Sequence, residues 1–202
     1  MGRHFAKSQT QRSLENFKIG QELMPKSLIH SFAILKEACA KANLHFNKIS
    51  EKQCEAIVKV CQNIEDGQYL DQFPLHVWQT GSGTQTNMNA NEVIANRAIE
   101  ILGGKKGDYT IVNPNDDVNC GQSTNDVIPT AGKMTSLHLL QNLKKQLLRL
   151  YDALNEKAKE FDHVIKMGRT QMQDAVPIRL GQEFKAYSVA IMRDIHRMDK
   201  AM

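Results

Sequence analysis

Hydrophobic residues recur at helical spacing in three segments of the first half of the chain. Residues 28–43 place an apolar side chain at every third or fourth position, as in a helix with one buried face. A second segment begins after Ser50, a residue type that favours a helix N-cap, and ends near Gly67. A third segment covers residues 89–102 and is closed by Gly103 and Gly104. We therefore expect three helices in this half.

The strongest helical periodicity lies further on, over residues 129–160. Leucines recur there at alternating intervals of three and four, as in a helix packed in a bundle: Leu140, Leu143, Leu147, Leu150 and Leu154. A last apolar stripe consists of Phe184, Ile191, Ile195, Met198 and Met202. Neither helix can bury its stripe alone, so both require partner helices. We interpret the methionines as core residues rather than as part of a cofactor site.

Strand signals are confined to Tyr109–Val112, and no hairpin turn flanks that segment. The predicted fold is therefore mainly α. A small, mostly helical N-terminal domain is expected over residues 1–128, followed over residues 129–202 by the first long helices of a central helical bundle. Met202 falls inside a helical pattern without a C-cap, which predicts that the chain is a fragment and the bundle incomplete.

Composition excludes several classes of function. The net charge of +4 comes from 26 basic and 22 acidic residues without long blocks of one sign, which argues against a nucleic-acid partner. There is no uncharged apolar run long enough to span a membrane, and the first residues lack the apolar core of a signal peptide. The four cysteines form no CxxC pair and no zinc-ligand spacing, so reduced thiols, no metal and a cytoplasmic location are expected.

Three polar loops carry the candidate chemistry. The first, residues 79–89, contains two glycines and the hydroxyl residues Ser82, Thr84 and Thr86, and a predicted helix follows it. Glycines let the backbone turn tightly and expose N–H groups, and a helix start favours an anion. This loop is interpreted as an anion site or as a plain connector.

The second loop covers residues 113–119 and continues into residues 122–126, where small polar residues are dense. One interpretation is turn and cap chemistry, with Asx-turns at Asn115 and Asp116 and with Asp126 near a helix N-terminus. The second interpretation is a cluster of neutral hydrogen-bond donors for a carboxylate.

The third loop covers residues 168–177, between two predicted helices. It is interpreted as a polar turn that Pro177 ends, and a buried Arg169–Asp174 ion pair would hold that turn together.

The order of these motifs resembles the aspartase/fumarase superfamily, whose members add or remove a small nucleophile across the double bond of fumarate. The resemblance rests on three regions and covers the chain from about Thr10 to its end: Gly81-Ser82-Gly83-Thr84 with Asn87-Met88-Asn89, Gln122-Ser123-Thr124-Asn125-Asp126, and Gly168-Arg169-Thr170 with Leu180-Gly181-Gln182-Glu183.

The resemblance implies a homotetramer with a central helical bundle, active sites shared between three subunits, a small dicarboxylate substrate and no cofactor. Elimination in this family passes through a doubly charged aci-carboxylate, which preorganised donors stabilise by a few kcal/mol each. The resemblance implies these roles: Thr84, Ser123 and Thr124 hold the carboxylate with Ser82 nearby; Asn125 and Thr170 bind the leaving group; Gln171 is a neutral hydrogen-bonding partner there; Asn113, Asn115 and Asp116 belong to a peripheral carboxylate site.

Position 171 bears on the leaving group. Fumarases resembling this chain carry a histidine there, which can take and give protons near neutral pH, whereas Gln171 can only form hydrogen bonds. Asn113 likewise replaces a histidine of the peripheral site in fumarases. Both differences favour the elimination of ammonia from L-aspartate, in an aspartate ammonia-lyase.

The sequence is also compatible with functions besides ammonia elimination. Residues 10–17, 78–84 and 114–119 resemble fumarases, so a class II fumarate hydratase comes next after the ammonia-lyase, whereas residues 166–177 and 181–184 resemble aspartases. The family's third signature, a flexible loop with the serine assigned as catalytic base, has no counterpart in the chain. This absence predicts that the chain alone is inactive, and it is consistent with a noncatalytic truncated relative as well. Argininosuccinate and adenylosuccinate lyases fit less well, because they carry a histidine in the region of Ser123 and Thr124.

Overall fold

The structure is a computed structural model and describes residues 8–202. It divides into two compact units, which we describe separately. The N-terminal unit ends at Thr135, and the C-terminal unit comprises Ser136–Met202. The predicted domain boundary between residues 128 and 129 stays a prediction.

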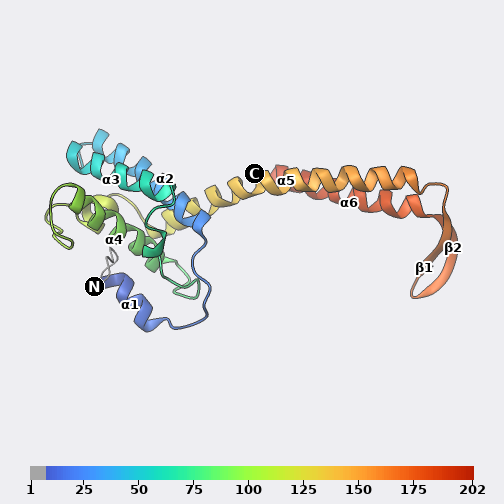
Figure 1. Cartoon of the computed structure of the whole chain (residues 1–202), viewed down its shortest axis with the longest axis horizontal. Helices are drawn as coiled ribbons and strands as arrows, with labels where there is room; N and C mark the ends of the chain where they lie inside the picture. The colour runs from blue at the N-terminus through green and yellow to red at the C-terminus, as the bar shows by residue number, and fades with distance from the viewer. Residues whose placement is uncertain (1–7) are drawn as a thin grey trace. The chain divides into compact units, whose positions relative to one another are not determined.

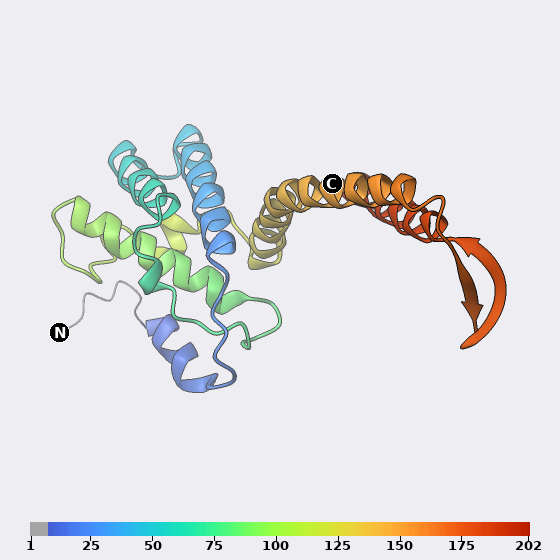
Figure 2. The same cartoon turned by 45° about the vertical axis from the view of Figure 1, so that its right-hand side comes forward.

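The N-terminal unit is helical, as predicted. Figures 1 and 2 show α2 and α3 lying side by side with α4 against them. Its elements are α1 (Ser8–Asn16), α2 (Lys26–His45), α3 (Glu51–Glu65), the short 3-10 helix η1 (Leu70–Gln72), α4 (Thr84–Ile101), the π-helix η2 (Pro114–Val118) and the first turns of α5 (Thr124–Glu160). The three predicted helices are confirmed, although α4 begins earlier than expected, at Thr84 rather than Asn89.

The core of this unit is built around α4, which is buried on nearly all sides. Val93 and Ile99 of α4 are completely buried, and they belong to one apolar cluster with Phe32 of α2 and Ile57 and Val60 of α3. Each such side chain stabilises the fold by roughly 1.5–3 kcal/mol when removed from water. A helix that is buried all round lies inside a protein, and packing of α4 in the core therefore fixes the position of its N-terminus.

Local capping agrees with the sequence at one predicted position. Ser50 Oγ accepts a hydrogen bond from the Gln53 N–H, and the Gln53 side chain accepts one from the Ser50 N–H, so the start of α3 forms a capping box. The start of α5 was predicted at Pro129, but the helix begins at Thr124 and contains Pro129. Proline is common at the first helical position, which made Pro129 a misleading boundary signal.

The C-terminal unit contains the rest of α5, a β-hairpin and α6 (Leu180–Ala201). Strands β1 (Ile165–Thr170) and β2 (Gln173–Arg179) pair antiparallel, with Thr170 opposite Gln173. The third loop is therefore a hairpin and not the predicted turn that ends at Pro177. Tyr109–Val112, the segment with strand-like composition, lies in turns and bends instead.

The hairpin escaped prediction because its tip lacks a turn signal. Gln171 and Met172 both have positive φ, 51° and 63°, in a two-residue connection where asparagine and glycine are usual. The predicted Arg169–Asp174 ion pair does form, with 3.0 Å between Nε and Oδ1, but both side chains are exposed rather than buried. An exposed pair of this kind contributes little stability, so the strand pairing carries the hairpin.

Helices α5 and α6 approach each other closely at Gly181. A Cβ at Gly181 would lie 2.3 Å from the Ala158 carbonyl oxygen, so only glycine fits this contact. Further along, the Ser188 hydroxyl donates to Asn155 Oδ1 over 3.1 Å, and the Phe161 and Phe184 rings pack with centroids 5.4 Å apart.

The predicted leucine stripe is only partly covered by this pairing. Leu143 and Leu150 of α5 remain 50% and 45% exposed, and Tyr187 of α6 is 56% exposed. Two helices thus leave apolar side chains in water that a larger bundle would bury.

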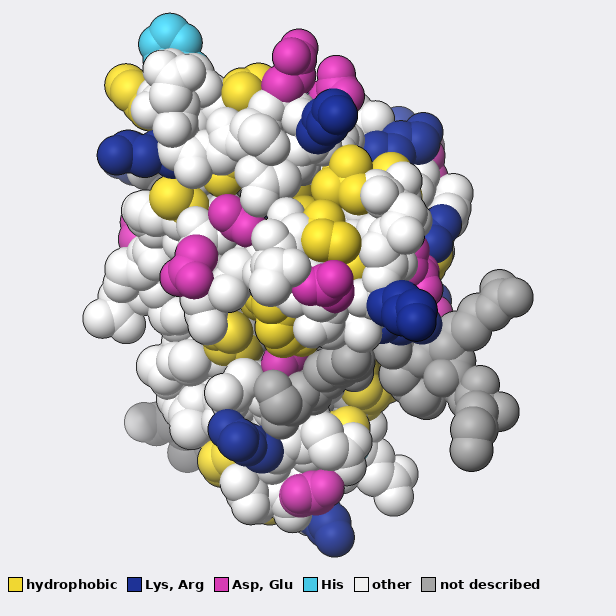
Figure 3. All heavy atoms as spheres, turned by 90° about the vertical axis from the view of Figure 1, so that its left-hand side faces the viewer, with side chains coloured by type: hydrophobic (Ala, Val, Ile, Leu, Met, Phe, Trp, Pro, Cys, Tyr) yellow, Lys and Arg dark blue, Asp and Glu magenta, His cyan; other side chains and the backbone are white. Residues whose placement is uncertain are grey.

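None of the described helices is long and apolar enough to cross a bilayer. On the face drawn in Figure 3, acidic and basic side chains are interspersed among uncharged ones.

Candidate active site

The first polar loop is pressed against the start of α5. Gly83 has φ 71°, and a Cβ there would lie 2.8 Å from Ile128 Cδ1, so both backbone conformation and space favour glycine. Because Gly83 caps α4 without a side chain, Gln79 supplies the cap. Its Oε1 accepts from the N–H and the hydroxyl of Thr86, both at 3.0 Å. The contact of Gly83 with Ile128 and the bonds from Thr86 to Gln79 therefore both fix the loop conformation.

Two predicted substrate-binding residues lie together at the start of α4. The hydroxyl oxygens of Ser82 and Thr84 are 2.9 Å apart. They line a small cavity of about 320 Å³ together with Gln9, Thr80, Gln85 and Met88. Hydroxyl groups at a helix N-terminus, where the macrodipole is positive, suit an anionic ligand.

The remaining predicted substrate-binding residues open α5. Ser123 Oγ accepts from the Asn125 N–H over 3.3 Å. Thr124 Oγ1 accepts from Asn87 Nδ2 over 3.1 Å. Since Asn87 belongs to the first turn of α4, this bond joins the two helix starts. The structure thus brings the first and second polar loops together, with two helix N-termini and several hydroxyl groups in one region.

A buried cation lies beneath this junction, and sequence reasoning missed it. Lys36 of α2 is 0% exposed, and its Nζ donates to Asn119 Oδ1 over 2.9 Å and to Gln122 Oε1 over 2.8 Å. Asn119 Oδ1 also accepts from Asn87 Nδ2 over 3.2 Å. Burial lowers the pKa of Lys36 to about 8. The available signal was a lysine on the apolar face of α2, four positions after Phe32.

Helix α1 is fixed to the same unit by a buried carboxylate. Glu92 of α4 accepts from the backbone N–H groups of Gln9 and Thr10, at 2.8 and 3.2 Å, and from the Thr10 hydroxyl at 2.8 Å. A carboxylate at a helix N-terminus is favourable for the helix dipole. This contact positions Gln9 beside the hydroxyl residues of the small cavity.

Thr170 and Gln171 belong to the C-terminal unit. They end strand β1 and begin the hairpin tip, and both are exposed. Their side chains are presented outward from their unit.

In the predicted peripheral site, Asn113 forms hydrogen bonds that shape the backbone. Asn113 Oδ1 accepts from the backbone N–H groups of Asn115 and Asp116, at 2.8 and 3.2 Å, and so caps η2. The turn chemistry expected at Asn115 and Asp116 is therefore supplied by Asn113. The side chains of Asn115 and Asp116 are exposed.

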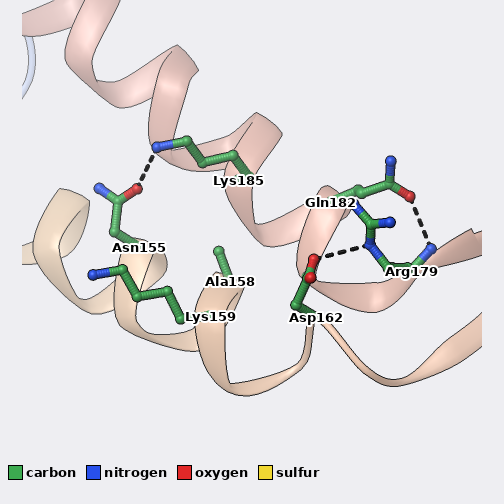
Figure 4. A pocket seen from close by; sticks show the side chains of 8 residues that line it. Asn155, Ala158, Lys159, Asp162, Arg179, Gln182 and Lys185 are labelled. Atoms are coloured by element: carbon green, nitrogen blue, oxygen red, sulfur yellow. Dashed lines mark hydrogen bonds and ion pairs between the residues drawn. The ribbon is translucent and has the colours of Figure 1, made fainter.

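A larger cavity of about 530 Å³ lies in the C-terminal unit, between the end of α5 and the start of α6. Figure 4 shows two pairs among its polar residues, Asn155 with Lys185 and Asp162 with Arg179. It contains none of the predicted site residues. Among residues 8–202, no cluster of His, Cys, Asp and Glu side chains is arranged to hold a metal ion.

Comparison with known proteins places the chain in a family. A family model described as "Lyase" matches residues 3–202, almost the whole chain. The chain belongs to this lyase family, the aspartase/fumarase superfamily, as its three motifs indicated.

Individual relatives within the family carry two different names. The chain is 48% identical over 196 residues to class II fumarate hydratase from Rhizobium meliloti (strain 1021), covering 96% of this chain and 42% of the relative. It is 50% identical over 193 residues to aspartate ammonia-lyase from Bacillus subtilis (strain 168), covering 96% of this chain and 41% of the relative. The chain thus spans about two-fifths of the length of these curated relatives.

Solved structures confirm the fold. The native fumarate lyase:delta crystallin from Brucella melitensis matches with a TM-score of 0.90 and 45% identity, over 98% of this chain and 46% of that one. Class II fumarase from Schistosoma mansoni matches with a TM-score of 0.87 and 42% identity, over 96% of this chain and 41% of that one.

Proposed function

We propose that the chain is part of a lyase that eliminates a small group from a four-carbon dicarboxylate to give fumarate. The observation that supports this most strongly is the meeting of two helix N-termini lined by hydroxyl groups. Thr84, Ser123 and Thr124 bind one substrate carboxylate, with Ser82 beside them, and Asn125 contacts the leaving group. These donors are neutral, and an arriving carboxylate therefore brings the negative charge that both helix starts favour.

This arrangement suits the chemistry of elimination. Removing the weakly acidic proton next to a carboxylate places a second negative charge on that carboxylate. Donors that already point at it stabilise this charge without reorganisation, and each contributes roughly 3 kcal/mol, by analogy with an oxyanion-hole donor. The serine assigned as the base in related enzymes has no counterpart in these 202 residues. The isolated chain is therefore expected to bind the dicarboxylate without turning it over.

Ammonia is the leaving group that Gln171 favours. An amide side chain has no accessible pKa and cannot act as an acid or a base near neutral pH. It can still hold an amine, which leaves as a charged or readily protonated group. Thr170 and Gln171 at the hairpin tip would supply these contacts to the amine. The first choice of substrate is therefore L-aspartate.

Fumarate hydratase is the second candidate, favoured by two observations. Residues 10–17, 78–84 and 114–119 resemble fumarases, and the chain is similar over nearly its whole length to a class II fumarate hydratase. In that case malate is the substrate and water the leaving group, while the carboxylate site keeps the same residues.

The homotetramer that the family resemblance implies is part of this proposal. The exposed leucines of α5 and the exposed tip residue Gln171 are both explained if further subunits cover the helices and receive the hairpin tip. The peripheral site at Asn113, Asn115 and Asp116 is a further, weaker part of this proposal.

The test is an assay of the full-length protein with aspartate and malate side by side, following the absorbance of fumarate. Turnover of aspartate without turnover of malate is expected. Turnover of malate alone would refute ammonia elimination, and turnover of neither would favour a noncatalytic role. In a Gln171→His variant, aspartate turnover should not rise substantially, because the amide contact to the amine is lost.

A further inference from the structure

Lys36 is a buried charge whose immediate hydrogen-bond partners are neutral. They are the amide oxygens of Asn119 and Gln122. The titratable groups that act on it are the thiols of Cys39 on α2 and Cys61 on α3. Burial raises the pKa of both thiols, so they stay protonated near neutral pH and supply no negative charge. A buried cation without a negative partner lowers the stability of the fold, so stability alone does not explain Lys36.

The hydrogen bonds around Lys36 have a defined direction. An ammonium group can only donate, so both amides must present oxygen to it. Their nitrogens then face backbone carbonyls: Asn119 Nδ2 donates to Gln122 O over 3.0 Å, and Gln122 Nε2 donates to Val118 O over 2.9 Å. Lys36 therefore fixes the orientation of two side chains in the segment just before α5.

The orientation of the Asn119 amide also determines how Thr124 forms hydrogen bonds. Because Asn119 Oδ1 is an acceptor, Asn87 must turn its Nδ2 toward it, and the same nitrogen donates to Thr124 Oγ1. Asn87 Oδ1 is buried without a hydrogen-bond partner among the described residues. The opposite orientation of Asn87 would place two amide oxygens 3.2 Å apart. Thr124 Oγ1 therefore accepts from Asn87, and its own hydrogen is left to donate elsewhere.

We propose that Lys36 is a positioning residue for the carboxylate site, which aims the Thr124 hydroxyl hydrogen at the bound dicarboxylate through Asn119 and Asn87 and supplies a buried positive charge beneath it. This inference rests on the proposed function. Lys36 does not touch the substrate. It acts through oriented amides, and the arriving carboxylate provides the negative charge that the surroundings of Lys36 lack.

The test measures the affinity of the full-length protein for fumarate by titration calorimetry from about pH 7 to about pH 9.5. Wild-type affinity should fall roughly tenfold as Lys36 loses its proton, the effect of about 1.4 kcal/mol from a buried charge nearby. In Lys36→Met, affinity should already be roughly tenfold weaker at the lower pH and show no such fall. Lys36→Arg keeps its charge and should bind well throughout. Lys41→Met, on the exposed side of the same helix, is the matched control and should behave as wild type.

A purely structural role for Lys36 gives different results. If Lys36→Met and Lys41→Met bind fumarate equally well across this pH range, the inference is wrong. Should the methionine variant fail to fold, a wild-type pH dependence in Lys36→Arg would overturn it. Absence of fumarate binding by the wild type would count against the proposed function instead. A neutron crystal structure of Lys36→Met, which distinguishes amide oxygen from nitrogen, then decides separately: rotated Asn119 or Asn87 amides support the inference, and unchanged amides refute it.

Discussion

The buried charge on Lys36 should make the free energy of unfolding depend measurably on pH. Its pKa is about 8 in the folded protein, against an ordinary value of about 10.5 for an exposed lysine. Between these values the unfolded chain binds more protons than the folded one, so the free energy of unfolding rises with pH. Below pH 8 the full cost of burying the charge, about 3 kcal/mol, is present. Raising the pH from about 7 to about 9.5 should recover about 2 kcal/mol of it.

The cysteines act in the opposite direction. Burial raises the pKa of Cys39, Cys54 and Cys61. Their thiols ionise first in the unfolded chain, so their contribution to stability falls as pH rises above their unfolded pKa of about 8.5. The Lys36→Met variant retains these thiols, so the difference between wild type and variant reports the titration of Lys36 together with its coupling to Cys39 and Cys61.

The assay is urea unfolding followed by circular dichroism, under reducing conditions, at several pH values. Absolute stability at one pH is not diagnostic, since the methionine removes a buried charge but also removes the donor to the Gln122 oxygen, at a cost of roughly 1–3 kcal/mol, while Asn119 Oδ1 keeps its bond from Asn87. The slope is diagnostic. Wild type should gain about 2 kcal/mol on the variant across this range. Parallel pH profiles would show that Lys36 is not a buried charge.

Four further substitutions test close packing, the anchor of α1 and the backbone of the hairpin tip. Gly181→Ala should destabilise the α5–α6 pair by more than about 2 kcal/mol, because its Cβ would meet the Ala158 carbonyl. Gly132→Ala on α5 has open space around the new Cβ and should stabilise the protein by up to about 1 kcal/mol. Thermal unfolding of both variants separates the effect of close packing from that of helix propensity. Glu92→Gln should lower the free energy of local opening of α1 by roughly 1–3 kcal/mol. Amide exchange over residues 9–16 should become faster while exchange in α3 stays unchanged. An equal change in exchange rate in α1 and α3 would contradict the proposed anchor. Met172→Gly should stabilise the hairpin by about 1 kcal/mol, because the methionine is fully exposed at φ 63°; slower amide exchange in β1 and β2 checks this, and faster exchange would refute it.

The helices of the N-terminal unit could be predicted because burial and periodicity agree there. The start of α3 could be predicted from Ser50, because the side chains of Ser50 and Gln53 accept hydrogen bonds from backbone N–H groups within the same short segment. The start of α4 was harder, because its capping group comes from Gln79, several residues upstream of the Gly83 N-cap. In the second loop several residues can cap, and the sequence could not distinguish Asn113 from Asn115 and Asp116.

The hairpin and the buried lysine required three-dimensional information. Positive φ at Gln171 and Met172 is imposed by strand pairing rather than by residue preference. Lys36 interrupts an apolar stripe in sequence, and only the folded chain shows that amides from the segment before α5 surround it. The hydroxyl residues of the carboxylate site were predictable from their motifs, but the direction in which Thr124 donates was not. Their roles in substrate binding stay predictions.

The central claim is that the starts of α4 and α5 together bind a substrate carboxylate. A crystal structure of the full-length protein with fumarate bound tests this most directly. One fumarate carboxylate should lie within hydrogen-bonding distance of the hydroxyl groups of Thr84, Ser123 and Thr124. Fumarate bound elsewhere, with these three hydroxyl groups facing only water, would contradict the account.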